Sequence, residues 1–508
     1  MRGGNLTAVA VAALGAAGYL LLAPPSADLA AQEYRAGLGL VIWNNGWYAG
    51  HHTSGYSVLF PPLGGLLGAR VTGALAAVAA AALFAALARR HWPPPAAGAA
   101  ALWFAAGTTA ILLTGRLTFL LGVGIGLGAL LALAHERRAL AGALALLTTL
   151  ASPVAGLFVA LAIVGWALAS PRERAPAAAA LALAALAPIG LTLMLFPQGG
   201  SEPFVASAFW PALAASLALA ALLPAEERAL RAGALLYAPA LAAAFAIATP
   251  LGGNATRLGA LAAGPVLLGA LAGRRSPALL AALALPLAYW ALYPGVRDVA
   301  RASGDPSVQA AYHAPLLRFL ETRRGTFRVE IPPTQNHWEA RHVAGARDGF
   351  PLARGWERQL DRRHAALFYD GSLDAASYRA WLDEHAVAYV AVPDVALDYA
   401  ARDEARLIAG GLPYLREVWR DAHWRVLAVR RPRPLAVGAT AALTADGIAL
   451  RSRRAGDVLV RVRHTRWWRV VDGRGCVRRD PRGMTVVRVR APGVVRLQAR
   501  LSGRSCRP

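Results

Sequence analysis

Residues 71–88 read VTGALAAVAAAALFAALA, a run without a single charge, and Arg89-Arg90-His91 follows directly. As a helix, a run of this length crosses the roughly 30 Å hydrocarbon layer of a bilayer. Similar runs recur up to about residue 290, so that 56% of the chain is hydrophobic and only 16% is charged, against about a quarter charged in globular domains. The sequence therefore predicts a polytopic α-helical membrane protein.

The apolar runs predict about 11 transmembrane helices. The expected spans are 6–23, 58–88, 96–113, 117–134, 138–150, 153–170, 176–196, 208–223, 231–249, 258–272 and 276–294. Two of them, 138–150 and 258–272, are short for a full bilayer crossing, which is typical of tilted or broken helices inside a bundle. The first run is longer than the apolar core of a signal peptide, so we expect an uncleaved anchor.

Arginine-rich connections alternate along the chain with poorly charged ones. Because positive loops stay on the cytoplasmic side, this alternation predicts a multi-pass plasma-membrane protein with a cytoplasmic N-terminus and an extracytoplasmic C-terminal part. The net charge of +24 does not predict a nucleic-acid partner. The basic residues are all arginine, which indicates a general preference for arginine over lysine rather than a binding surface.

We expect three domains. Residues 1–294 form the helical membrane domain, with one large outer loop at 24–57. Residues 295–432 alternate helical and strand patterns and predict an α/β domain, whereas 433–508 contain short strands typical of a small β-sandwich-like module. Cys476 and Cys506 both fall in this module, where either a disulfide or two free thiols is compatible with an extracytoplasmic location.

Carboxylates and arginines at the outer ends of spans are the first candidates for chemistry, because charge near a membrane is costly to keep. Asp28 follows the first span and is a candidate general base, or else a cap of the helix that begins there. Glu33 is a weaker candidate, for substrate binding, since such a residue more often lies on a solvated face. Arg116 and Arg257, the latter near Asn254, suit a lipid-linked phosphate, although an arginine can also snorkel.

The outer loop gathers aromatic and histidine side chains, which suit a sugar-binding cleft. The candidate substrate-binding residues there are Trp47, Tyr48, His51, His52 and Tyr56. Interfacial anchoring, packing and hydrogen bonding within the loop are the alternatives. We expect no metal site, because adjacent histidines point in different directions and no third ligand has a recognisable spacing. The Walker A, GxSxG, HExxH and CxxC motifs are absent from the sequence.

Taken together, an acid directly after span one, the stretch WYAGHHTSGYSVLFPPLGGLLG, about 11 spans and an external C-terminal region resemble the C-type glycosyltransferase superfamily (GT-C). The stretches GGNATRLG, HWEARHVA, PLARGWERQLD, LFYDGSLDAASYRAWL and PYLREVWRDAHWRVLAV are most similar to uncharacterised actinobacterial integral membrane proteins. Many enzymes of the superfamily carry paired acids in the first outer loop, whereas Asp28 has no acidic neighbour.

The resemblance implies an inverting glycosyltransferase that takes a sugar from a polyprenyl-phosphate donor to a cell-envelope glycan or glycolipid acceptor. It places Asp28 as the base. It implies no organic cofactor and leaves a divalent metal such as Mg or Mn open. Two alternatives remain: a lipid or polysaccharide transporter or flippase, and a non-catalytic assembly protein of the envelope.

Overall fold

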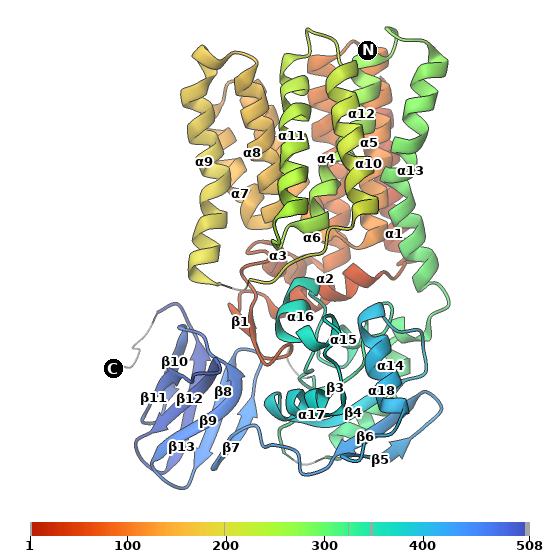
Figure 1. The fold of residues 1–508 in the computed structure, drawn as a ribbon. Helices are drawn as coiled ribbons and strands as arrows, with labels where there is room; N and C mark the ends of the chain where they lie inside the picture. Colours follow the sequence, from red (N-terminus) through yellow and green to blue (C-terminus); the bar gives the residue numbers. More distant parts are fainter. Residues whose placement is uncertain (1–2, 198, 324, 346–348, 503–508) are drawn as a thin grey trace. The chain divides into compact units, whose positions relative to one another are not determined.

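The computed structural model describes residues 3–197, 199–323, 325–345 and 349–502. The chain divides into two compact units, one of residues 1–32 and 55–303 and the other of residues 33–54 and 304–508. Figure 1 shows helices throughout the first unit, and helices with all the described strands in the second. The long outer loop is thus divided, because its central residues pack with the C-terminal region.

The first unit is a helical bundle. Its helices are α1 (Gly3–Leu22), the start of α2 (Ala27–Leu38), α3 (Phe60–Leu67), α4 (Ala69–His91), α5 (Pro94–Thr114), α6 (Leu117–Ala134), α7 (Arg138–Ala151), α8 (Pro153–Leu168), α9 (Pro171–Leu195), α10 (Ala206–Leu222), α11 (Arg228–Ala246), the 3-10 turn η1 (Gly252–Thr256), α12 (Arg257–Leu271) and α13 (Pro277–Ala302). Helix α4 packs against α1, α5 and α6. Its buried face is made of small residues such as Ala77 and Ala81, which allow the close helix contacts common in membranes.

Each predicted span coincides with a helix, and the polytopic membrane fold is confirmed. Six described helices are long and apolar enough to cross a membrane, and α1 with α2 forms a further candidate that is bent by 81°. Helices α7, α8 and α10 are apolar but shorter. The predicted span 58–88 is divided into α3 and α4 at Gly68, and α13 continues to Ala302, beyond the expected boundary at 294.

The second unit contains a mixed sheet flanked by helices. Its order is β3 (Arg328–Glu330), β4 (Val387–Pro393), β6 (Trp424–Val429) and β5 (Leu415–Arg420), with β3 and β4 parallel and the other pairs antiparallel. The helical elements are η2 (Pro306–Val308), α14 (Ala310–Glu321), α15 (Glu339–His342), α16 (Arg358–His364), η3 (Ala366–Phe368), α17 (Ala375–Glu384), η4 (Tyr399–Ala401) and α18 (Arg402–Ala409). The parallel pair agrees with the predicted α/β character.

The last seven strands form two antiparallel sheets, as the alternating pattern predicts. One sheet has the order β10 (Trp468–Asp472), β13 (Gly493–Ala499), β8 (Gly447–Ser452), β7 (Ala439–Leu443); the other has β11 (Gly475–Arg479), β12 (Met484–Val489), β9 (Gly456–Arg463). Inward residues of both sheets, among them Leu450, Val460 and Val487, share one core. Cys476 is disulfide-bonded, and Cys506 lies outside the described residues.

A short hairpin from the outer loop completes this core. It consists of β1 (Trp43–Asn44) and β2 (His51–His52). The Trp43 side chain is 2% exposed and lies within the core of the two sheets, with its ring 5.8 Å from that of Trp468. The Asn45 amide donates to the carbonyls of Thr444 and Gly447. The hairpin is therefore part of the second unit, although it precedes that unit in sequence by more than 250 residues.

Candidate active site

Asp28 and Arg116 form an ion pair in the helical bundle. The chain bends between α1 and α2, so that Asp28 lies in the first turn of α2. Arg116 stands directly before α6. Its Nε lies 3.1 Å from Oδ2 of Asp28, and each side chain is about one third exposed. A base candidate and a phosphate-binding candidate, which lie 88 residues apart in sequence, are thus brought together.

Gly115 makes this contact possible. It ends α5 in the left-handed region with φ of 76°, which glycine adopts without steric cost. A Cβ atom on Gly115 would lie 2.4 Å from the backbone nitrogen of Leu29. Only a glycine at this position therefore lets the start of α2 approach closely enough for Asp28 to meet Arg116.

Arg257 is the second cation of the site. It follows η1 and begins α12, and its guanidinium lies over the Phe119 ring, 5.4 Å from the centroid. Arg116 and Asp28 are both close enough to act on it electrostatically. Among the described residues, no hydrogen bond or ion pair engages the Arg257 guanidinium, so its N–H groups are available to bind an anion. Asn254 lies one turn earlier, and its carbonyl accepts the backbone N–H of Arg257.

A polar chain and a further carboxylate surround the pair. Gln32 donates to the Tyr56 hydroxyl at 3.1 Å and accepts from Thr118. Asp298, near the end of α13, interacts electrostatically with both Arg116 and Asp28. This second acid comes from the far end of the bundle sequence, where no local pattern marks it. Tyr56 is the candidate substrate-binding residue that lies in the same unit as Asp28.

An apolar cavity of about 610 Å³ lies inside the bundle, lined mainly by residues of α4, α6, α8, α10, α11 and α12. A smaller cavity of about 40 Å³ lies beside Arg116 and Arg257. Phe119, Leu261 and Trp290 line both cavities. The large cavity is itself lined by Arg90 and His91, and these three shared residues connect it to the small cavity beside Arg116 and Arg257.

The remaining loop candidates belong to the core of the second unit. Trp47 and Tyr48 are fully buried; the Trp47 indole donates to the Ala340 carbonyl at 3.1 Å, and the Tyr48 hydroxyl donates to the Glu357 carbonyl at 3.2 Å. Trp47 also stacks on Tyr34 with ring centroids 4.1 Å apart. These contacts favour the packing interpretation over the sugar-binding one.

The two adjacent histidines are buried as well. His51 lies 3.9 Å from the Glu357 carboxylate, and His52 hydrogen-bonds Thr465 at 2.9 Å. Burial lowers the pKa of both, that of His52 to about 3. Glu33 is 3.9 Å from Arg341. In the described part of the chain, no three His, Cys, Asp or Glu side chains form a group able to hold a metal ion.

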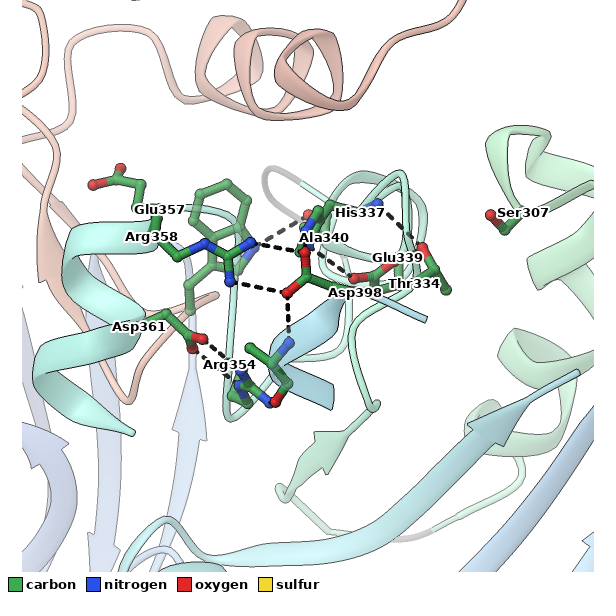
Figure 2. A network of polar contacts seen from close by, with 12 residues as sticks. Ser307, Thr334, His337, Glu339, Ala340, Arg354, Glu357, Arg358, Asp361 and Asp398 are labelled. Atoms are coloured by element: carbon green, nitrogen blue, oxygen red, sulfur yellow. Dashed lines mark hydrogen bonds and ion pairs between the residues drawn. The ribbon is translucent and has the colours of Figure 1, made fainter. Parts of the chain in front are cut away.

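A charged network in the second unit is drawn in Figure 2. Several of its residues lie in the stretches HWEARHVA and PLARGWERQLD, although the sequence alone assigns them no role. Arg354 pairs with Asp361 at 2.5 Å and with Glu404 at 3.2 Å, while Arg358 holds Asp398 at 2.8 Å. Burial would raise the pKa of Asp398, but His337 and Arg358 outweigh it and hold that pKa well below its usual range. Arg354, Asp361 and Glu404 are buried, whereas Arg358 and Asp398 are half-buried. The network therefore connects the loops around α16 to the sheet rather than forming an open cleft.

Comparison with known proteins finds similarity in structure only. No protein-family model matches the chain, and no curated protein matches its sequence. The archaeal oligosaccharyltransferase AglB from Archaeoglobus fulgidus, in complex with an inhibitory peptide and a dolichol-phosphate, is 13% identical with a TM-score of 0.48, over 77% of this chain and 69% of that one. The arabinofuranosyltransferase AftD from Mycobacteria is 15% identical with a TM-score of 0.46.

This chain spans 57% of the length of that arabinofuranosyltransferase, which covers 98% of the present one.

Proposed function

We propose that the chain is a membrane glycosyltransferase that moves a sugar from a polyprenyl-phosphate donor to a cell-envelope glycan or glycolipid. The observation that carries this proposal is the large apolar cavity, which shares three lining residues with the small cavity beside Arg116 and Arg257, together with Asp28 paired to Arg116. A prenyl chain needs an apolar space, its phosphate needs cations, and an acceptor hydroxyl needs a base. The three requirements meet within one unit of the protein.

The phosphate is expected to engage Arg257 first, because that guanidinium is not committed to a carboxylate. A guanidinium can hold two phosphate oxygens at once. The same phosphate offers Arg116 a new anionic partner in place of Asp28. Asp28 is then free to accept a hydrogen bond from the acceptor hydroxyl.

In the transfer step, Asp28 takes the proton of the acceptor hydroxyl while that oxygen attacks C1 of the sugar from the face opposite the phosphate. The bond between C1 and the phosphate oxygen breaks, and the anomeric configuration inverts. The electron pair leaves with the polyprenyl phosphate, whose growing charge the two arginines stabilise. No organic cofactor enters this scheme, and a divalent cation remains an open addition at the phosphate.

The orientation belongs to the same proposal. With the N-terminus in the cytoplasm and an odd number of spans, the second unit lies outside the cell, where a cell-envelope acceptor is found. The arginine-rich connections such as residues 89–91 and 274–275 support this orientation through the positive-inside rule.

The test is donor consumption by the purified full chain, offered a panel of polyprenyl-phosphate sugars. We expect Asp28→Asn to lower kcat by about 10²- to 10⁴-fold, the usual contribution of a general base, while expression and thermal stability stay near those of the wild type. Glu226→Gln is the matched control, because Glu226 is 78% exposed and also pairs with an arginine, Arg274. Unchanged transfer by Asp28→Asn would contradict the proposed mechanism.

Lipid translocation is measured in parallel with the same protein in vesicles. Movement of a labelled polyprenyl-phosphate sugar across the bilayer, without consumption of the donor, would favour the transporter alternative. Neither consumption nor movement would favour the non-catalytic assembly protein.

A further inference from the structure

The positive charge of the chain is concentrated in the β-sandwich-like module. Residues 433–508 contain 18 arginines and four acids, whereas residues 1–432 contain 35 arginines and 25 acids. A uniform preference for arginine does not explain this difference, because the acids are depleted in the module as well. The module therefore carries more than half of the net charge of +24 in less than a sixth of the chain.

The strand register brings three arginine-bearing turns together at one end of the module. These turns are residues 453–455, 473–474 and 490–492. Gly456 at the start of β9 and Gly475 at the start of β11 both pair with Val489 at the end of β12. Gly493 at the start of β13 pairs with Ser452, and the backbone N–H of Arg490 donates to the carbonyl of Arg474.

We call Arg453, Arg454, Arg474 and Arg490 at these turns the basic tip. All four are exposed. Among the described residues, the side chains of the first three form no ion pair, and Arg490 contacts only the sulfur of Cys476, at 3.4 Å. The tip is therefore positively charged and open to an anion.

The acids of the neighbouring strands are already occupied. Asp457 accepts from Arg478 at 2.6 Å and from Arg488 at 3.0 Å, and Asp472 pairs with Arg496. The tip charge is thus not compensated locally. It must be balanced by solvent ions or by an external anion.

The composition of the tip indicates which anion it suits. Its turns contain no aromatic or long aliphatic side chain, so they offer neither the stacking platform that single-stranded nucleic acid requires nor the interfacial anchor of a bilayer-inserting loop. What remains is several guanidinium groups at adjacent turns. Such an arrangement suits a chain with repeated carboxylates or phosphates, each of which can be held by charge-assisted hydrogen bonds.

We propose that the basic tip is a docking site for an acidic polysaccharide, a glycan with repeated carboxylate or phosphate groups. The choice of a glycan among polyanions rests on the proposed function, since an acceptor-binding module increases the local concentration of the acceptor. The tip acts by tethering, and it takes no part in the transfer step.

Binding is measured with the full chain in detergent, using polygalacturonate as the probe and neutral dextran as its control. We expect polygalacturonate to bind and its affinity to fall steeply with added salt. Combined substitution of Arg453, Arg454 and Arg474 by glutamine should weaken this binding about tenfold to hundredfold. The matched control replaces Arg318, Arg402 and Arg416 by glutamine; these are exposed arginines of the α/β region, and the same charge is removed.

Three outcomes would overturn the proposal: polygalacturonate binding no tighter than dextran, equal losses in both triple variants, or tighter tip-dependent binding to an oligodeoxythymidine or to phosphatidylglycerol vesicles. The result is separable from the proposed function, because the binding assay contains no donor. The tip variant should keep its rate with a short neutral acceptor, whereas Asp28→Asn should bind polygalacturonate as the wild type does. A chain that binds polygalacturonate but transfers no sugar contradicts the proposed function alone. A chain that transfers sugar but does not bind polygalacturonate contradicts the docking site alone.

Discussion

Replacement of Arg116 by glutamine separates a structural role of the Asp28 ion pair from a role in transfer. Each partner of the pair is about one third exposed, with 3.1 Å between Nε and Oδ2. Ion pairs with this degree of solvent contact contribute roughly 0–1 kcal/mol to stability. We therefore expect Arg116→Gln to change the free energy of unfolding by less than about 1 kcal/mol, and the melting temperature by a few degrees at most.

The expected effect on transfer is much larger. In the proposed mechanism Arg116 leaves Asp28 for the donor phosphate, so it stabilises charge that appears in the transition state. Loss of one such preorganised donor typically lowers kcat by about 10²- to 10³-fold. Because Arg257 would hold the same phosphate, the double variant with Arg257→Gln should show non-additive losses, with a coupling energy of about 0.5–3 kcal/mol.

Initial rates of donor consumption give kcat and KM for each variant, and thermal unfolding in the same detergent gives the stability. Arg274→Gln serves as the control, because its pair with Glu226 is exposed. A kcat equal to or above that of the wild type would refute the reasoning, since it would mean that Arg116 only restrains Asp28. A loss of activity that parallels a loss of folded protein would refute it as well.

Three further predictions follow from the cavity, the loop and the buried acids. Gly233 lines the large cavity and has open space at its Cβ position, so Gly233→Leu should raise KM for the lipid donor severalfold, whereas Gly190→Leu, outside the cavity lining, should not. Trp47→Ala should lower the free energy of unfolding by about 3–5 kcal/mol and so lower the melting temperature. Unchanged stability with impaired acceptor binding would instead support the sugar-binding interpretation. Burial raises the pKa of Glu330 well above its usual value and that of Glu404 to about 7. The folded state therefore retains protons that the unfolded chain releases, and stability should fall as pH rises from about 4.5 past 7. In thermal unfolding Glu330→Gln should flatten this pH dependence, and an unaltered slope would exclude the two glutamates as its cause.

The helices of the bundle could be predicted because a bilayer span has a fixed length and an apolar composition, both visible within one run. Strands such as Val387–Pro393 and Trp424–Val429 were equally predictable, since short β-branched and aromatic runs lie between turn residues. The contact between Asp28 and Arg116 could not be predicted, because it depends on how α2 and α6 pack. No spacing in a single sequence encodes that.

The outer loop shows a different limit. Trp47, Tyr48 and the two histidines have the composition of a sugar-binding cleft, and the same composition suits a polar-aromatic core. Their environment depends on partners such as Ala340 and Thr465, which occur hundreds of residues later. The excess of arginine after residue 433, in contrast, is visible in the sequence itself once the acids of each domain are counted separately.

The hairpin of residues 43–52 imposes an order on biosynthesis. The Trp47 indole donates to the carbonyl of Ala340, which is synthesised 293 residues later, and the Asn45 amide donates to that of Gly447, synthesised 402 residues later. At about 5–20 residues per second, this delay is roughly 15–80 s. During that time the loop can form the stack of Trp47 on Tyr34, but not its hydrogen bonds to the later carbonyls. A chain interrupted before residue 340 would therefore contain the whole loop and yet lack the carbonyl to which its Trp47 indole donates.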